Sequence, residues 1–344
     1  MESLIVSSSP HIKSKRTTRF FMQDVVLALM PAVIMSAVYF SWRALILVSI
    51  SVASCILFEF LYTKILKKPT TIGDWSAVVT GLLLGMNLPV AAPLYIPVIG
   101  AAFAIIVVKM LYGGLGKNIA NPAIAARIFL FISYSKVMTT WVAPTTAAGQ
   151  NASSIPLFAN VDVVSTATPL TYLKDAEKIT SIFRHFSIGK LFAGNYAGCI
   201  GETCSILLLL GGLFLLARKV ISWHIPVSFI GTVALITFVF PKYSTVPRFE
   251  YMLFHLLSGG LMLGAFFMAT DYATSPTTPK GRIIYGCGCG LLTVLIRYFG
   301  GYPEGVSFAI LIMNFFAWYI DHHTIPHKFG GEKRVFHGFK KAKK

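Results

Sequence analysis

"TGLLLGMNLP" at residues 80–89 and "GGLMLGAFFMATD" at residues 259–271 share the pattern G-L-x-L-G. The likeness continues into "MLYGGLGKNIANPAIAARIFLFI" (110–132) and "RYFGGYPEGVSFAILIMNFFAWYI" (297–320), which follow the two copies. Each copy therefore runs from an apolar segment through a polar break and a Gly-Gly turn to a closing apolar segment. This pattern predicts an internal repeat.

The composition around these copies is that of a membrane protein. The chain has 344 residues, of which 55% are hydrophobic and 12% are charged, and its mean hydropathy is +0.70. A soluble domain has about 25% charged residues. We therefore predict an all-α polytopic membrane protein.

Apolar segments long enough to cross the bilayer recur along the chain, since about 20 residues span the hydrocarbon layer. Ten are predicted, five in each copy. An odd number of spans per copy inverts the second copy relative to the first, and such repeats place binding sites at their interface. The predicted spans are residues 22–40, 44–66, 75–91, 93–112, 119–135, 201–217, 223–240, 250–269, 282–299 and 304–321.

The net charge of +17 could suggest nucleic-acid binding, but its distribution indicates membrane topology instead. Basic residues gather at predicted span ends, which the positive-inside rule assigns to the cytoplasm together with both termini. Basic clusters there also favour contact with anionic lipid headgroups. The inner set is Lys13, Lys15, Arg16, Arg19, Lys64, Lys67, Lys68, Lys109, Lys117, Arg218, Lys219, Lys280 and Arg282, whereas Arg43, Lys242, Arg248 and Arg297 fall outside.

This topology divides the chain into five parts. A cytoplasmic segment (1–21) precedes the first five-helix repeat (22–135). A long extracytoplasmic loop (136–200) leads into the second repeat (201–321), and a basic cytoplasmic tail (322–344) follows.

Two polar breaks, "GGLGKNIANPA" (113–123) and "TDYATSPTTPKG" (270–281), lie on the predicted cytoplasmic side. Glycines allow close backbone approach, and Asn, Ser and Thr supply hydrogen-bond donors and acceptors. The breaks could hold a polar ligand, or they could be well-capped re-entrant turns.

The outer loop contains "DVVSTATPL" (162–170), for which the residues alone leave three interpretations open. Asp, Ser and Thr are common in caps and turns, so the stretch could be a plain surface loop. It could also line an ion or substrate vestibule, or be a site of covalent modification.

The motif D-x-x-S-x-A-T within this stretch resembles the flavinylation signature of a family that contains the D subunit of the Rnf complex and the B subunit of the sodium-pumping NADH:quinone reductase. The stretches "SPHIKSKRTT", "YGGLGKNIANPA", "MATDYATSPTTPKG" and "LIRYFGGYPEGVSFAILIMN" extend the resemblance over most of the chain. It implies FMN joined through a phosphoester to Thr168, with Asp162, Ser165 and Ala167 in supporting positions. Thr166 stands where the family often has glycine.

The resemblance further implies a urea-transporter-like fold of two inverted five-helix units in a prokaryotic cytoplasmic membrane. The chain would pass electrons between ferredoxin and NAD, coupled to sodium or proton export, as a subunit of an ion-translocating oxidoreductase. Its partners would be Rnf subunits A, B, C, E and G, especially the flavin-bearing G, and a flavin transferase would mature it. A second, non-covalent flavin (riboflavin or FMN) is expected at the two polar breaks, with candidate ligands Asn118, Asn121, Ser275, Thr277, Thr278 and Lys280.

Two other functions compete with this one: that of the B subunit of the quinone reductase, and that of a small-solute transporter or channel of the same fold. A scaffold subunit without cofactor is a third. No metal site is expected, because C-x-C at 287–289 and C-x4-C at 199–204 fall short of the four ligands of a structural site. Ionisable residues in or beside spans are costly and often functional; they are Asp24, Glu59, Asp74, Arg127, Glu202, Asp271, Arg297, Glu304 and Asp321.

Overall fold

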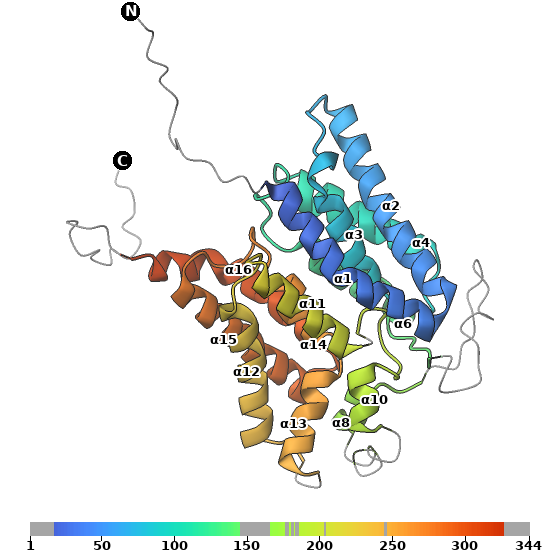
Figure 1. Cartoon of the computed structure of the whole chain (residues 1–344), viewed down its shortest axis with the longest axis vertical. Helices are drawn as coiled ribbons and strands as arrows, with labels where there is room; N and C mark the ends of the chain where they lie inside the picture. The colour runs from blue at the N-terminus through green and yellow to red at the C-terminus, as the bar shows by residue number, and fades with distance from the viewer. Residues whose placement is uncertain are drawn as a thin grey trace, which may run out of the picture.

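A computed structural model of the chain describes residues 17–144, 166–175, 179, 182, 186–202, 204–243 and 246–326, and there it is helical (Figure 1). These residues contain 14 α-helices, one 3-10 helix (η1) and two π-helical stretches (η2 and η5). The elements of the first half are α1 (Thr18–Phe40), α2 (Trp42–Ile65), η1 (Ile72–Asp74), α3 (Ser76–Met86), α4 (Tyr95–Ala102), η2 (Phe103–Met110), α5 (Pro122–Ser133) and α6 (Ser135–Met138). Those that follow are α8 (Pro169–Lys174), α10 (Ile188–Ala193), α11 (Ser205–Ala217), α12 (His224–Val239), α13 (Arg248–Leu257), α14 (Leu261–Leu263), η5 (Gly264–Met268), α15 (Pro279–Phe299) and α16 (Val306–Thr324).

Each of the ten predicted apolar segments overlaps one helix or one broken helix of the structure. Length and composition qualify α1, α2 and α15 as membrane spans. The pair α13 and Leu261–Met268 passes the same test together but is bent by 63° at the break between its halves. The described residues thus show three clear spans, or four with the bent pair, alongside shorter apolar helices.

The glycines of the repeated G-L-x-L-G pattern lie where helices touch. A Cβ on Gly81 of α3 would lie 2.6 Å from the Cα of Val52 in α2. In the second copy, a Cβ on Gly264 would lie 2.4 Å from the Cγ1 of Val306, the first residue of α16. Small residues let apolar helices approach closely in a membrane. The pattern therefore marks close helix packing in both copies.

The segment before α11 forms backbone hydrogen bonds at the C-terminal end of α3. The Ile200 amide donates to the Leu88 carbonyl (3.0 Å), and the Gly201 amide donates to the Met86 carbonyl (2.6 Å). The second bond satisfies a carbonyl that α3 leaves unpaired at its end, and the first pairs a carbonyl just beyond it. They also hold the next residue, Glu202, inside the protein, where it is 2% exposed.

Candidate functional site

Two hollow regions lie at opposite ends of α15. Arg282, in its first turn, lines a cleft of about 820 Å³, which we name the Arg282 cleft. Gly301, two residues beyond its end, lines a cavity of about 790 Å³, which we name the Thr166 cavity. At 1.5 Å per residue, a helix of 21 residues is about 31 Å long. That length is close to the ~30 Å thickness of a bilayer's hydrocarbon core.

The Thr166 cavity is lined by part of the loop in which the sequence predicts a modified threonine. Thr166, Ala167 and Thr171 lie on its wall, opposite Glu304 from the turn before α16. Thr168 caps α8: its hydroxyl lies 2.9 Å from that of Thr171 and accepts a hydrogen bond from the Thr171 amide (3.3 Å). Only 6% of Thr168 is exposed, so its side chain is already packed and bonded.

Lys174, the last residue of α8, ties this loop to the turn after α15. Its ammonium donates to the Gly301 carbonyl (2.6 Å) and to the Gly300 carbonyl. Burial lowers the pKa of Lys174, and the positive charge of Lys242 lowers it further. The same ammonium group borders the cavity and supplies it with a positive charge.

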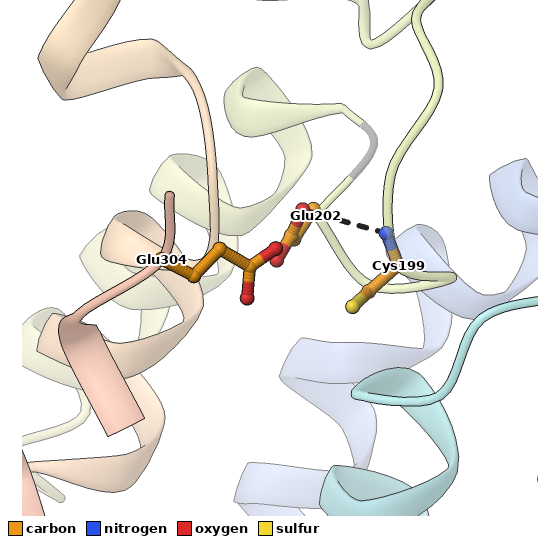
Figure 2. Close-up of side chains that lie close together, drawn as sticks. All are labelled: Cys199, Glu202 and Glu304. Carbon is orange, nitrogen blue, oxygen red and sulfur yellow. Dashed lines mark hydrogen bonds between the residues drawn. The ribbon is translucent and has the colours of Figure 1, made fainter. Parts of the chain in front are cut away.

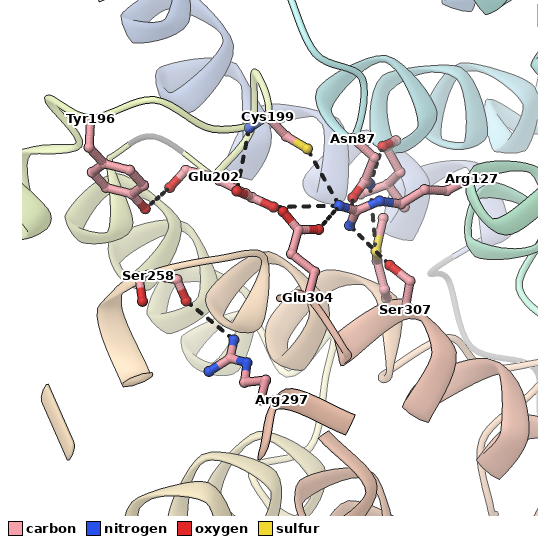
Figure 3. A network of polar contacts seen from close by, with 11 residues as sticks. Asn87, Arg127, Tyr196, Cys199, Glu202, Ser258, Arg297, Glu304 and Ser307 are labelled. Carbon is pink, nitrogen blue, oxygen red and sulfur yellow. Dashed lines mark hydrogen bonds and ion pairs between the residues drawn. The ribbon is translucent and has the colours of Figure 1, made fainter. Parts of the chain in front are cut away.

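A cluster of buried charges adjoins the Thr166 cavity (Figure 3). Arg127 of α5 forms ion pairs with Glu202 (3.5 Å) and with Glu304. Its guanidinium also donates to Asn87 Oδ1 (2.7 Å) and Ser307 Oγ (3.0 Å). The cluster therefore joins both halves of the chain through one arginine.

Cys199 lies at the edge of this cluster. Its Sγ and one oxygen of each carboxylate, from Glu202 and Glu304, lie within 4.8 Å of one another (Figure 2). This spacing would suit a metal ion, but Arg127 already contacts all three groups, with its Nη2 3.4 Å from the sulfur. A guanidinium in this position repels a cation, so we assign no metal to the cluster.

From Arg127 a line of polar contacts leads toward the other end of the molecule. Asn87 approaches the Met268 sulfur (3.7 Å), and Asn121 donates to the Met268 carbonyl (3.2 Å). Asn121 caps α5, since its side-chain oxygen accepts from the amides of Ala123 and Ile124. Both asparagines are almost fully buried.

Asn121 and Asn118 line a small cavity of about 70 Å³, which we name the Asn121 cavity. It adjoins the Arg282 cleft, because eight residues, among them Asp271, line both. The Oδ1 of Asn118 is buried and lacks a hydrogen-bond partner in the described structure. Buried polar atoms are normally bonded, so this oxygen indicates space for a hydrogen-bond donor that is not part of the described chain.

The structure brings only some of the predicted second-flavin ligands together. Ser275 lines the Arg282 cleft. Thr277 is exposed and bonds to Asp321 (2.9 Å from its amide), and the Thr278 hydroxyl lies 2.6 Å from that of Thr324. Lys280 is exposed, so these last three connect or flank the ends of α15 and α16 instead of pointing to a shared site.

Two further predicted residues, Asp162 and Ser165, lie outside the described residues. The structure adds Asn87 and Ser307, which sequence reasoning did not single out, and Cys199, which it considered only as a metal ligand. Their only signal in the sequence is a polar side chain within or beside an apolar segment.

Three of the basic residues used to predict the topology are buried inside the protein. Lys109 is 1% exposed and pairs with Glu59 at 2.6 Å. Arg43 is 4% exposed and donates to the carbonyls of Val90 (2.8 Å) and Ala92 (3.0 Å). Arg297 is also buried. The charge count places Lys109 on the cytoplasmic side and Arg43 and Arg297 on the outer side; because these three side chains are buried in the protein, the remaining basic residues carry the charge argument.

Comparison with known proteins relates this architecture to one family. The model of the NQR2, RnfD, RnfE family matches residues 5–330. The chain is 46% identical over 333 residues to the D subunit of the Na(+)-translocating ferredoxin:NAD(+) oxidoreductase complex of Acetobacterium woodii, covering 96% of each protein.

Two further relatives cover a similar share. The D subunit of the proton-translocating ferredoxin:NAD(+) oxidoreductase complex of Clostridium ljungdahlii is 42% identical over 94% of this chain and 96% of its own length. The D subunit of the ion-translocating oxidoreductase complex of Shewanella amazonensis is 39% identical over 94% and 97%. With a family match over most of its length and relatives above 30% identity, the chain belongs to the NQR2, RnfD, RnfE family.

Proposed function

We propose that this chain is the flavin-carrying D subunit, embedded in the membrane, of an ion-translocating ferredoxin:NAD oxidoreductase, the Rnf complex. The names of its relatives support this function over that of the B subunit of the quinone reductase. The single observation that carries the flavin is that Thr166 and Ala167 of the D-x-x-S-x-A-T motif line the Thr166 cavity together with Glu304 of the charge cluster. A plain transporter has no need for such a motif.

The residues around the cavity suit an FMN on Thr168. The cavity volume of about 790 Å³ lies within the ~300–1,000 Å³ of small-molecule sites. Thr166 and Thr171 offer hydroxyl groups, and the ammonium of Lys174 offers a positive charge for the phosphate. A flavin attached there would supply the electron transfer, and the protein would supply its position and electrostatic surroundings.

A second, non-covalent flavin (riboflavin or FMN) belongs at the other end of α15. The unpartnered oxygen of Asn118, beside Asn121, suits the donors of a flavin ring edge or ribityl chain. The Asn121 cavity alone is smaller than the ~300 Å³ of typical ligand sites, so the adjoining Arg282 cleft would hold most of the ligand.

In the complex, the chain would form ten spans as an inverted five-plus-five repeat in the prokaryotic cytoplasmic membrane. Both termini would face the cytoplasm, and Thr168 would face outward. Electrons would arrive from the flavin of the G subunit and leave toward the cytoplasmic, NAD-facing side, with subunits A, B, C and E as further partners. The separation of the two hollow regions by the length of α15 supports flavin sites near opposite faces of the membrane.

Peptide mass spectrometry tests the covalent flavin. The chain is produced with its flavin transferase, and we expect the mass of FMN on the peptide that contains Thr168. Thr168→Val should abolish this addition because it removes the acceptor oxygen, whereas Thr166→Val is the matched control and should retain it. An unmodified wild-type peptide, with the transferase active on another substrate, would refute the proposal and favour a transporter.

Flavin extraction tests the second site. Asn118→Ala should reduce the non-covalent flavin about five- to 150-fold while the FMN on Thr168 remains, because it removes the unpartnered acceptor and a lost buried hydrogen bond costs about 1–3 kcal/mol. Thr277→Ala is the control, because Thr277 bonds to Asp321 at the surface. Full flavin content in the Asn118 variant would contradict this assignment.

A further inference from the structure

Glu304, at the wall of the Thr166 cavity, belongs to a set with three buried charged side chains, Arg127, Glu202 and Arg297. The four charges balance only when both acids are ionised. Arg127 contacts Glu202 and Glu304 directly. Arg297 of α15 donates to the carbonyls of His255 (2.6 Å) and Ser258 (3.3 Å), and no ion pair to a carboxylate is present among the described residues. Buried charges are stable only when opposite charges or hydrogen bonds compensate them. A change in the charge inside the cavity must therefore disturb the balance between the two arginines and the two glutamates.

Glu304 is the member of the set that reaches the cavity. Its side chain is 15% exposed and lines the Thr166 cavity, whereas that of Glu202 is 2% exposed and lies behind it. Their carboxylate oxygens lie within 4.8 Å of each other. A proton from the cavity would therefore meet Glu304 first and could then be shared with Glu202.

The groups facing this carboxyl pair come from several elements. Arg127 approaches from α5, and Cys199 from the segment before α11. Arg297 lies on the α15 side, with His255 behind it on α13. Across the cavity stand the ammonium of Lys174 and the carboxyl group of Asp175.

A negative charge entering the cavity would disfavour two ionised carboxylates next to it, because like charges raise the affinity of an acid for its proton. The unpartnered Nε of Arg297 shows that this neighbouring cation is not saturated by the described chain. The carboxyl pair is thus the part of the cluster that can take up a proton when an electron is added to the cavity.

We propose that Glu202 and Glu304 together bind one proton when an electron occupies the Thr166 cavity and release it when the electron leaves. This inference rests on the proposed function, which places a flavin in that cavity. The electron comes from the donor subunit of the complex and the proton from water on the cavity side. One negative and one positive charge therefore arrive together, and both leave again.

Infrared difference spectroscopy of the flavinylated complex tests the inference. On reduction, we expect the carbonyl stretch of one carboxylic acid to appear and to shift in D₂O. Glu304→Gln and Glu202→Gln should each lose this band, because each removes one partner of the pair. Glu250→Gln, which changes an acid in the first turn of α13 outside the cluster, should retain it.

A wild-type complex that carries FMN but gains no carboxylic-acid band on reduction would overturn the inference, and so would a band that persists in both glutamine variants. The wild-type result is decisive even if a variant fails to fold. A chain without FMN would refute the proposed function instead. In that case an infrared pH titration of the same chain still tests the pair, since Glu304→Gln should remove one titrating carboxyl group.

Discussion

Replacing Lys109 with methionine should destabilise the protein strongly. Lys109, near the end of the π-helical stretch η2, is 1% exposed and donates to Glu59 and to the Ser76 hydroxyl, each at 2.6 Å. Glu59 is completely buried in α2. Methionine has nearly the same length but no charge, so the variant would leave the Glu59 carboxylate buried without its cation.

The expected loss is about 3–5 kcal/mol in the free energy of unfolding, the usual result of removing one partner of a buried ion pair. The double variant Glu59→Met with Lys109→Met should recover most of that loss, because well-packed apolar groups can replace a buried pair at little cost. Lys64→Met, at an exposed lysine in the last turn of α2, should change stability by no more than about 0.5 kcal/mol.

The assay is reversible unfolding in mixed micelles, with the free energy extrapolated to zero denaturant for all four proteins. If Lys109→Met were as stable as the parent, the pair would not be buried as described. If the double variant were as unstable as the single one, the loss would come from packing and not from an uncompensated charge.

Two further predictions concern helix packing and the segment around α8. Gly81→Ala should lose about 1–3 kcal/mol, because its Cβ would lie 2.6 Å from the Val52 backbone, whereas Gly231→Ala in α12 meets nothing within 4 Å and should gain about 0.5–1 kcal/mol. Equal stabilities in chemical denaturation would contradict this. Lys174→Met should speed amide hydrogen exchange in α8 at least tenfold by removing its bond to the Gly301 carbonyl, with α12 as the internal control. Unchanged exchange in α8 would show that another contact holds the helix.

Local sequence signals predicted the helices well. Apolar segments of the right length coincide with helical elements, and Asn121-Pro122 begins α5 as a cap followed by proline should. Hydrophobicity could not show that a span is bent or interrupted: the 63° bend between α13 and the segment from Leu261 depends on packing around Ser258–Gly260.

The charge cluster was less predictable. Arg127, Glu202 and Glu304 each stood out as an ionisable residue in or near an apolar segment, but 75 and 177 residues separate the arginine from its partners. Only the tertiary fold brings them into contact. For the same reason, the sequence could not show that Lys109 is paired in the interior, since its partner Glu59 lies 50 residues away.

If Thr168 carries FMN as proposed, its packing at the start of α8 would constrain the order of events during biogenesis. An enzyme that esterifies Thr168 needs its oxygen in open solution, yet in the finished fold that oxygen is bonded to Thr171 and the residue is 6% exposed. Attachment of FMN would therefore compete with packing of the Thr168 segment against the rest of the protein. A chain in which this segment packs first would remain unmodified. The timing of folding, and not only the motif, would then decide what fraction of the protein becomes active.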